Sequence, residues 1–318
     1  MLGRTRERVV GQIPGFDDGF LILDGGLATE LERRGHDVSG PLWSAQLLRT
    51  APEAIEQLHY EYFAAGARCA ISASYQASYE GFAARGLGSD ETTALLRRSV
   101  ELAQSARARY RRDHPADHRQ LYVAASVGPY GAISHDGAEY RGDYGLTKEQ
   151  LIEFHARRFG VLATSGADFL ACETIPELDE ALALATLLAQ YPDARAWISF
   201  TSADGIQTAH GELLTDCARL LDRVANVIAI GVNCVRPEVV GEAIRALKAG
   251  TSKAIVVYPN SGEHWDGQTR SWHGSWDHGS LAALAPQWVS AGAQMIGGCC
   301  RIGPGEIAAL DEALHQSL

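Results

Sequence analysis

The residues of this sequence best suited to chemistry are three cysteines. Cys234 follows one apolar run, and the adjacent pair Cys299 and Cys300 follows another run that ends in two glycines. Three thiolates form a favourable ligand set for Zn2+ and leave its fourth tetrahedral position open to a substrate. Neighbouring residues of a regular strand point to opposite faces, so both members of the pair reach one ion only if the strand ends before them. Gly297 and Gly298 provide the backbone freedom for such a break.

The same cysteines also fit a simpler interpretation, because an unpaired cysteine is among the residue types most often buried in a core. We adopt that interpretation for the three isolated cysteines, Cys69, Cys172 and Cys217. For Cys234 and the adjacent pair, metal binding and core packing both stay open on pattern alone. The chain has no Cys-x-x-Cys spacing, which argues against a structural zinc knuckle built from four cysteines.

Two acidic residues also follow apolar runs. Asp24 precedes Gly25 and Gly26, and Glu173 ends another run. With no base nearby, these acids predict a bound ammonium group, and free N–H groups at the start of the helix beyond Gly25 can hold a carboxylate. Either acid can instead cap the helix that follows it. An ammonium, a carboxylate and a thiophilic metal together describe an amino acid that carries a thiol.

Aromatic and amide side chains add candidate contacts. A wall of aromatic rings attracts a cationic sulfonium group through cation–π contact, although each ring also suits ordinary packing. Gln76 is a candidate contact to such a donor, and Asn233 is a candidate contact to the substrate or a support for the metal ligands. Three histidines lack the i, i+4 spacing of a helical metal site, so a second metal site is not favoured there. The tyrosines concerned are Tyr75, Tyr79, Tyr130, Tyr140 and Tyr144, and the histidines are His264, His273 and His278.

These residues lie at the ends of elements that alternate along the whole chain. Short apolar or β-branched runs predict strands, and the longer stretches between them have helical periodicity. The expected strands are 20–24, 70–74, 121–126, 168–172, 196–201, 227–232, 254–258 and 294–297. The clearest expected helices are 90–112, 147–165, 176–190 and 236–249. Eight such units predict an α/β fold with a parallel sheet, and over this length they favour a single-domain (β/α)8 TIM-type barrel over an open doubly wound sheet.

Glycine and loop positions refine this organisation. A Gly-Ala step before a strand suits the left-handed position that ends a helix, and it occurs at residues 66–67, 166–167 and 292–293. Residues 260–280 are rich in Trp and His without a clean period, and we expect a long loop after the seventh strand, on the active-site face. We assign residues 1–16 to an N-terminal extension and 17–318 to the barrel.

Composition limits the function classes. The 318 residues are 46% hydrophobic and 21% charged, which is typical of a globular protein with a sizeable core. The net charge of −11 argues against a nucleic-acid partner, because phosphate binding needs clustered Lys and Arg. No targeting segment and no membrane span is visible, so we expect a cytoplasmic protein whose thiols stay reduced and no membrane partner.

Longer motifs carry a family resemblance. Gly-Val-Asn-Cys at 231–234 and Gly-Gly-Cys-Cys-Arg at 297–301 resemble the two zinc-ligand motifs of the homocysteine S-methyltransferase family. Leu-Asp-Gly-Gly at 23–26 resembles the opening strand of that family. The branch that uses S-methylmethionine in bacteria and plants is similar at residues 72–78, 128–132, 139–144, 171–174 and 257–263. The resemblance extends from about residue 20 to residue 310.

The resemblance implies a barrel with Zn2+ on Cys234, Cys299 and Cys300. It also implies that Asp24 and Glu173 hold the amino group of homocysteine, with backbone near Gly25 serving its carboxylate. Two departures stand out. The family often has two threonines after the Cys-Cys-Arg run, where this chain has Ile302 and Gly303. The extension before Asp17 has no recognisable counterpart.

The expected activity is therefore zinc-dependent transfer of a methyl group from S-methylmethionine, or S-adenosylmethionine, to the thiol of L-homocysteine, which forms methionine. One alternative is a betaine-using or other thiol or selenol methyltransferase of the same family. Another is a barrel that stores zinc or thiols without turnover, which gives no reason for Asp24 and Glu173. A zinc hydrolase is disfavoured because a centre with three thiolate ligands is a poor activator of water.

Overall fold

Eight parallel strands form the centre of the molecule in a computed structural model that describes residues 19–38, 44–133, 137–266, 271–273 and 280–316. The strands are hydrogen-bonded in the order β1-β10-β7-β6-β5-β4-β3-β2. They are β1 (Leu21–Ile22), β2 (Cys69–Ile71), β3 (Tyr122–Val127), β4 (Phe169–Ile175), β5 (Ala196–Phe200), β6 (Val227–Asn233), β7 (Ala254–Tyr258) and β10 (Ala293–Ile296). All eight strands expected from the sequence are therefore present.

The sheet closes on itself between its two outermost strands. Leu23 pairs with Cys69 in a parallel bridge, and the Asp24 N–H donates to the Cys69 carbonyl at 3.0 Å. On the other side of the bridge, the Arg68 N–H donates to the Ile22 carbonyl at 2.8 Å. These contacts join β1 to β2, so the predicted (β/α)8 barrel is confirmed.

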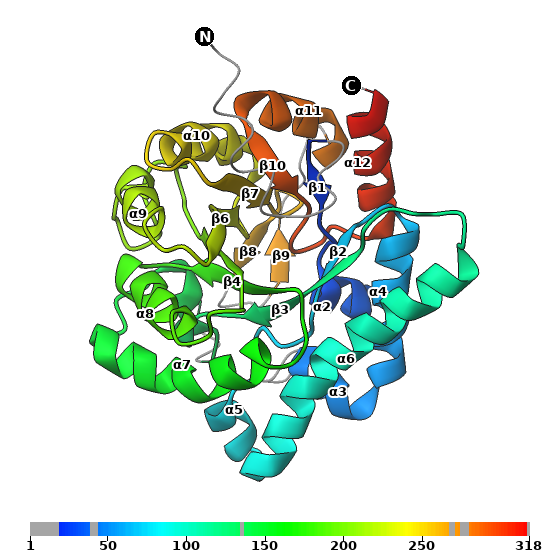
Figure 1. Cartoon of the computed structure of the whole chain (residues 1–318), viewed down its shortest axis with the longest axis horizontal. Coiled ribbons are helices and arrows are strands. Elements are labelled where there is room, and N and C mark those ends of the chain that lie inside the picture. Colours follow the sequence, from blue (N-terminus) through cyan, green and yellow to red (C-terminus); the bar gives the residue numbers. More distant parts are fainter. Residues whose placement is uncertain (1–18, 39–43, 134–136, 267–270, 274–279, 317–318) are drawn as a thin grey trace.

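Helices surround the strands (Figure 1). They are α2 (Leu27–Arg33), α3 (Ser44–Thr50), α4 (Pro52–Ala64), α5 (Tyr79–Ala83), α6 (Ser89–Asp113), α7 (Lys148–Ala163), α8 (Leu178–Leu188), α9 (Leu214–Leu221), α10 (Pro237–Lys248), α11 (Leu281–Ala291) and α12 (Pro304–Gln316). Two short 3-10 helices, η1 (Tyr130–Ile133) and η2 (Ala138–Tyr140), follow β3. No helix in the described ranges combines the length and the apolar character needed to cross a membrane.

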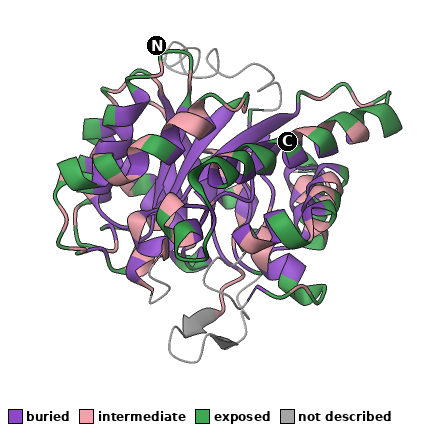
Figure 2. Cartoon of the chain, turned by 90° about the horizontal axis from the view of Figure 1, so that it is seen from below, coloured by how far each residue is buried: buried purple, intermediate pink, exposed green. Residues whose placement is uncertain are grey.

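Burial follows from this arrangement. Every residue of β3, β4 and β6 is buried, as expected of parallel strands that are covered on both faces. Alternate strand residues fill two separate cores. Trp197, Tyr122 and Met295 belong to the core inside the barrel, whereas Ile198 and Val123 pack against the outer helices. Figure 2 shows buried strands in the centre and exposed positions on the outer helices.

Local sequence signals set several helix ends. Gly66, Gly166 and Gly292 have φ of +104°, +82° and +116°, which confirms the left-handed stops expected at the Gly-Ala steps. Helix α7 begins with a capping box, in which the Thr147 hydroxyl accepts from the Gln150 N–H and the Gln150 side chain accepts from the Thr147 N–H.

The expectation of a wholly irregular loop over residues 260–280 needs a correction. This segment contains a two-stranded antiparallel sheet, β8 (His264–Asp266) with β9 (Ser271–His273), in which Trp265 is opposite Trp272. Strands of three residues are too short for a period-two pattern to be recognised in the sequence. Residues 267–270 and 274–279, and the extension assigned to residues 1–16, lie outside the described residues.

Candidate functional site

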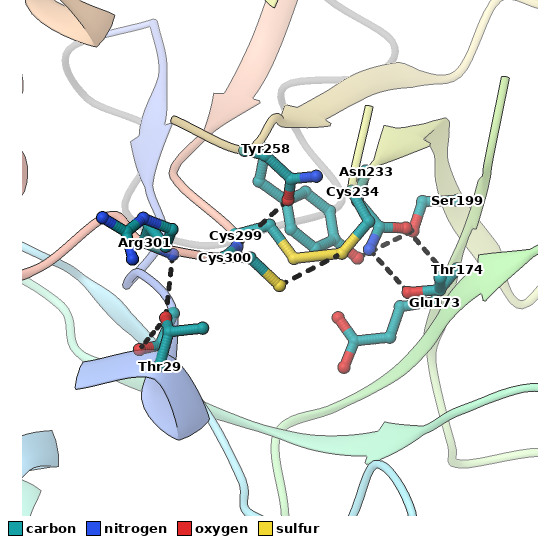
Figure 3. The surroundings of a disulfide bond; sticks show 12 residues. Thr29, Glu173, Thr174, Ser199, Asn233, Cys234, Tyr258, Cys299, Cys300 and Arg301 are labelled. Carbon is teal, nitrogen blue, oxygen red and sulfur yellow. Dashed lines mark hydrogen bonds between the residues drawn. A yellow bond between two sulfur atoms is a disulfide. The ribbon is translucent and has the colours of Figure 1, made fainter. Parts of the chain in front are cut away.

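Three sulfur atoms meet at the carboxyl ends of β6 and β10. Cys234 directly follows β6, and Cys299 and Cys300 follow the end of β10 at Ile296. The three sulfurs lie within 4.8 Å of one another. Cys234 and Cys299 form a disulfide, and the Cys300 Sγ lies 4.0 Å from the Cys234 Sγ (Figure 3). Residues 65 positions apart in the chain thus supply one compact sulfur cluster.

The strand ends before the cysteine pair, as it must if both cysteines are to reach one ion. Gly297 and Gly298 have no strand pairing, yet neither has a positive φ. Their small size serves close packing: a Cβ on Gly298 would lie 2.2 Å from the Ile302 side chain, and one on Gly297 would lie 2.6 Å from the Leu23 Cβ. Glycine is therefore needed at these two positions because Leu23 and Ile302 pack closely against them, and not because the backbone makes a left-handed turn.

Hydrogen bonds from neighbouring loops fix the backbone of the pair. The Cys299 N–H donates to the Pro259 carbonyl at 2.7 Å, and the Cys300 N–H donates to the Asn260 side-chain oxygen at 3.1 Å. The next residue, Arg301, donates its N–H to the Thr29 hydroxyl at 2.8 Å. Helix α2 and the loop after β7 therefore hold the loop after β10 in place.

The donor set suits a thiophilic metal ion. Three sulfur ligands from two strand ends match the open three-ligand arrangement of a catalytic zinc site, in which the substrate takes the fourth position. Cysteine binds a metal as thiolate, so the disulfide and a bound ion are alternative uses of Cys234 and Cys299. Cys69, Cys172 and Cys217 are buried and unbridged, in agreement with their assignment to the core.

Asp24 is buried at the end of β1, beside this cluster. Its Oδ2 accepts from the Ile71 N–H at 2.8 Å, and its backbone carbonyl accepts from the Gly298 N–H at 3.0 Å. Its Oδ1 has no hydrogen-bond partner among the described residues. Burial raises the pKa of Asp24 well above its ordinary value, and the nearby Glu173 carboxyl adds to the rise. Helix α2 is capped at Gly26, so Asp24 does not serve as its cap.

Glu173 lies near the end of β4 and points toward the sulfurs (Figure 3). The Ser126 hydroxyl donates to its Oε1. Burial raises the pKa of Glu173 to about 7, although hydrogen bonds from Ser126 and Tyr258 favour its charged form. Helix α8 is capped at Glu177, so the capping alternative fails for Glu173 as well. Two buried carboxyl groups that resist ionisation favour the arrival of a positive charge between them.

Asn233 holds the turn after Glu173. Its Oδ1 accepts from the Thr174 N–H and the Ser199 hydroxyl, both at 2.7 Å, and its Nδ2 donates to the Thr174 hydroxyl at 2.8 Å. These bonds stabilise Thr174 at a φ of +62°, an uncommon value for a residue other than glycine. Of the two roles considered for Asn233, the geometry favours support over direct contact.

Gly25 and Gln76 complete the set expected from the sequence. A Cβ on Gly25 would lie 2.2 Å from the Ile302 carbonyl, so this position admits no side chain. The Gln76 Nε2 donates to the Ala132 carbonyl in η1 at 3.2 Å. The same segment carries Tyr130, whose ring centroid is 5.1 Å from that of Tyr144. Gln76 therefore connects the loop after β2 to the aromatic segment after β3.

Several participants were not found from the sequence. Ser199, Tyr258 and Trp197 form a buried chain of hydrogen bonds, in which the Tyr258 hydroxyl lies 2.7 Å from the Ser199 hydroxyl and 3.0 Å from the Trp197 Nε1. The sequence offered one signal for such contacts, namely the polar residues Ser126 and Ser199 within otherwise apolar strands. Their partners lie on other strands, so the sequence could not identify them.

Comparisons with known proteins point in one direction. The family model described as homocysteine S-methyltransferase matches residues 21–314. A homocysteine S-methyltransferase of Escherichia coli is 50% identical over 91% of this chain and 94% of its own length. The Bacillus subtilis homocysteine S-methyltransferase YbgG is 47% identical over 90% of this chain and 92% of its own length.

Solved structures agree. The Escherichia coli homocysteine methyltransferase MmuM in its metallated form superposes with a TM-score of 0.85 at 44% identity, over 97% of this chain and 99% of that one. The oxidized form of MmuM superposes with a TM-score of 0.84 at 47% identity, over 92% of this chain and 96% of that one.

Proposed function

The chain belongs to the homocysteine S-methyltransferase family and catalyses methyl transfer to homocysteine, and on that premise we propose that its metal is Zn2+ and that its donor is S-methylmethionine, or S-adenosylmethionine. The observation that carries the proposal is the sulfur cluster of Cys234, Cys299 and Cys300 beside two buried carboxyl groups. The metallated form described for MmuM supports a metal at this centre.

The protein's own groups define the metal site. The three cysteines would hold Zn2+ in their reduced, thiolate form and leave one position for the homocysteine sulfur. When bound, zinc would supply a Lewis acid that lowers the pKa of that thiol from about 8.5 and fixes the position of the sulfur. Hydrogen bonds to the backbone of Cys299 and Cys300 keep the ligands oriented.

The amino-acid part of homocysteine fits the opposite side of the site. We assign its ammonium to Asp24 and Glu173, whose buried carboxyl groups gain a positive partner when it binds. Backbone near Gly25 is assigned to its carboxylate, because α2 begins just beyond Gly25 and N–H groups at the start of a helix attract anions. Asn233 supports Glu173 through Thr174.

The reaction itself requires little from general acid–base groups. The homocysteine thiolate attacks the methyl carbon of the sulfonium in line, a new C–S bond forms, and the old C–S electron pair stays on the departing sulfur. A thiolate and a cation become two neutral thioethers, so charge is lost, and a site shielded from water favours this step. Tyr75, Tyr130 and Tyr144 lie in the segments nearest Gln76 and supply aromatic faces for the cationic donor.

The metal assignment is tested first. Protein purified under reducing conditions should carry about one zinc per chain, measured by inductively coupled plasma mass spectrometry. Cys234→Ala should lose both zinc and methyl transfer, by about 1000-fold or more, since a Lewis acid contributes several kcal/mol to such a step. Cys217→Ala, a buried cysteine on α9, is the matched control and should retain both. Full methyl transfer in Cys234→Ala would overturn the proposal.

The donor is tested by separate assays with each candidate. Homocysteine labelled with deuterium on its carbon chain is incubated separately with S-methylmethionine, S-adenosylmethionine and betaine, and labelled methionine is counted by mass spectrometry. The label is needed because S-methylmethionine also leaves methionine as its demethylated product. The highest kcat/KM is expected with S-methylmethionine. A preference for betaine would replace the donor assignment, and no labelled methionine with any donor would favour the non-catalytic storage alternative.

A further inference from the structure

A buried histidine lies next to the Asp24 carboxyl group. His59 is on α4, fully buried, and its Nδ1 is 4.0 Å from the Asp24 Oδ2. Among the described residues, neither ring nitrogen of His59 has a hydrogen-bond partner. The nearest carboxyl group is itself incompletely paired, because Asp24 Oδ1 also lacks a partner. Buried polar atoms without partners are costly, and a pair of them at one point calls for a functional reason.

Asp24 is a polar neighbour of His59 that has an open hydrogen-bonding position. The face of α4 that carries His59 also carries Ile55 and Tyr62, which are fully buried. The Tyr62 hydroxyl is already committed to the Ile302 carbonyl at 3.0 Å. Burial lowers the pKa of His59 to about 4, so the imidazole is neutral and carries one N–H at neutral pH.

We propose that His59 is a positioning residue for homocysteine: its neutral imidazole donates an Nδ1–H hydrogen bond to Asp24 Oδ2 when the substrate ammonium pairs with the same carboxylate. This inference rests on the proposed function, in which Asp24 holds the ammonium. A shift of about 1 Å closes the 4.0 Å separation to a hydrogen bond. Such bonds are often long in a free enzyme and shorten when the substrate binds.

The consequence is a fixed orientation for Asp24. The Ile71 N–H and the His59 N–H would both hold Oδ2, which leaves Oδ1 to face the ammonium. Binding the ammonium requires an ionised Asp24, and a second hydrogen-bond donor stabilises that negative charge. The ammonium is held equally before and during methyl transfer, so loss of His59 should raise KM and leave kcat nearly unchanged.

Two substitutions separate the hydrogen bond from packing. His59→Asn retains an amide N–H near the position of Nδ1, whereas His59→Leu fills similar space without a donor. We expect His59→Leu to raise the KM for homocysteine about 10-fold or more, as for a lost hydrogen bond to a charged group, and His59→Asn to recover most of that loss. Equal KM values in both variants and the unchanged enzyme would overturn the inference, as would equal impairment of both. Leu58→Ala, on the same helix, controls for core damage and should lower stability without raising KM.

A double-mutant cycle tests whether His59 acts through Asp24. On an Asp24→Asn background, His59→Leu should cause no further rise in KM, and additive losses would contradict the inference. If Asp24→Asn alone leaves KM unchanged, the role of Asp24 in the proposed function fails. If Asp24→Asn raises KM but His59→Leu does not, only the role of His59 fails.

A measurement on the unmodified enzyme removes dependence on variants that fold poorly. In protein labelled with 15N-histidine, the His59 Nδ1 resonance should move when homocysteine is added. It should stay in place with 4-mercaptobutyrate, which has the thiol and carboxylate but no amino group. An unchanged resonance with homocysteine, or equal shifts with both compounds, would overturn the inference.

Discussion

Two buried groups of charged and titratable side chains lie on the N-terminal half of the barrel, and they differ in how completely they are paired. One contains His155, Arg158 and Glu180, between α7 and α8. Glu180 accepts from the His155 Nε2 at 2.8 Å and from the Tyr130 N–H at 2.5 Å. Arg158 donates to the Gly128 carbonyl and lies 3.0 Å from the His155 Nδ1. Each of the three residues therefore has at least two polar partners.

The other group contains Asp24 and His59. Asp24 has one side-chain hydrogen bond for its two carboxyl oxygens, and His59 has none among the described residues. In both groups, burial raises the pKa of the acid and lowers the pKa of the histidine. A shifted pKa therefore does not distinguish a binding site from a structural cluster here. The difference is one of degree. Glu180 Oε2 and one guanidinium nitrogen of Arg158 also lack partners among the described residues, but each residue of that group makes at least two polar contacts, whereas the Asp24 side chain makes one hydrogen bond and the His59 side chain makes none.

The largest effect should be a loss of stability when the group of His155, Arg158 and Glu180 is broken. Glu180→Ala removes the partner of His155 and of the Tyr130 N–H, and it removes the carboxyl group whose charge favours the buried Arg158 cation. We expect the free energy of unfolding to fall by about 3–5 kcal/mol, measured by urea denaturation. At temperatures well below unfolding, the KM for homocysteine should stay within about threefold. Glu180→Gln, which keeps an acceptor, should cost less, and a large rise in KM without lost stability would reverse the comparison.

Substitution in the group of Asp24 and His59 should instead weaken homocysteine binding without lowering stability. Asp24→Asn removes the charge that attracts the ammonium but keeps an acceptor for the Ile71 N–H. The KM for homocysteine should rise about 30- to 100-fold, which corresponds to about 2–3 kcal/mol, while the melting temperature stays constant or increases. Asp168 is a matched control, because its Oδ2 also accepts a strand N–H, from Val123 at 2.8 Å. Asp168→Asn should leave KM unchanged, and equal KM values in both variants would remove the distinction.

The last prediction concerns pH. Burial depresses the pKa of His59 from 6.5 to about 4, so the contribution of its neutral form to stability is complete above pH 6.5 and is lost as the pH falls toward 4. His59→Asn does not titrate, so its unfolding free energy should decrease less than that of the unchanged chain between pH 6.5 and 4. Urea denaturation of the reduced, metal-free proteins at several pH values measures this difference. If the two proteins show the same dependence of unfolding free energy on pH, His59 does not contribute to the pH dependence of stability.

Sequence reasoning reached the barrel because its signals are local and repeated. The eight apolar runs and the Gly-Ala steps depend on neighbours within one element, and the structure contains all of them. The cysteine cluster was accessible for a related reason, since parallel strands bring their carboxyl ends to one side of a barrel. The β8–β9 pair was missed because each strand has only three residues.

Side-chain partners were harder to predict than strand positions. Asn233 was expected near the substrate or the metal, but its amide is bonded to Thr174 and Ser199 on neighbouring strands. His59 occupies the buried face of an amphipathic helix, where a histidine is usually core, and its relation to Asp24 depends on the helix lying against the β1 end. Such pairings depend on tertiary distances, which one sequence does not contain.

The backbone around the site limits how it can be transplanted. Thr174, Cys234 and Arg301 have φ of +62°, +50° and +63°, values that cost energy for residues with a Cβ. An engineer who copied only the three cysteines onto another eight-stranded barrel would place the thiols on ordinary strand ends, pointing elsewhere. A working graft would also have to import the loops that hold these residues in left-handed conformations.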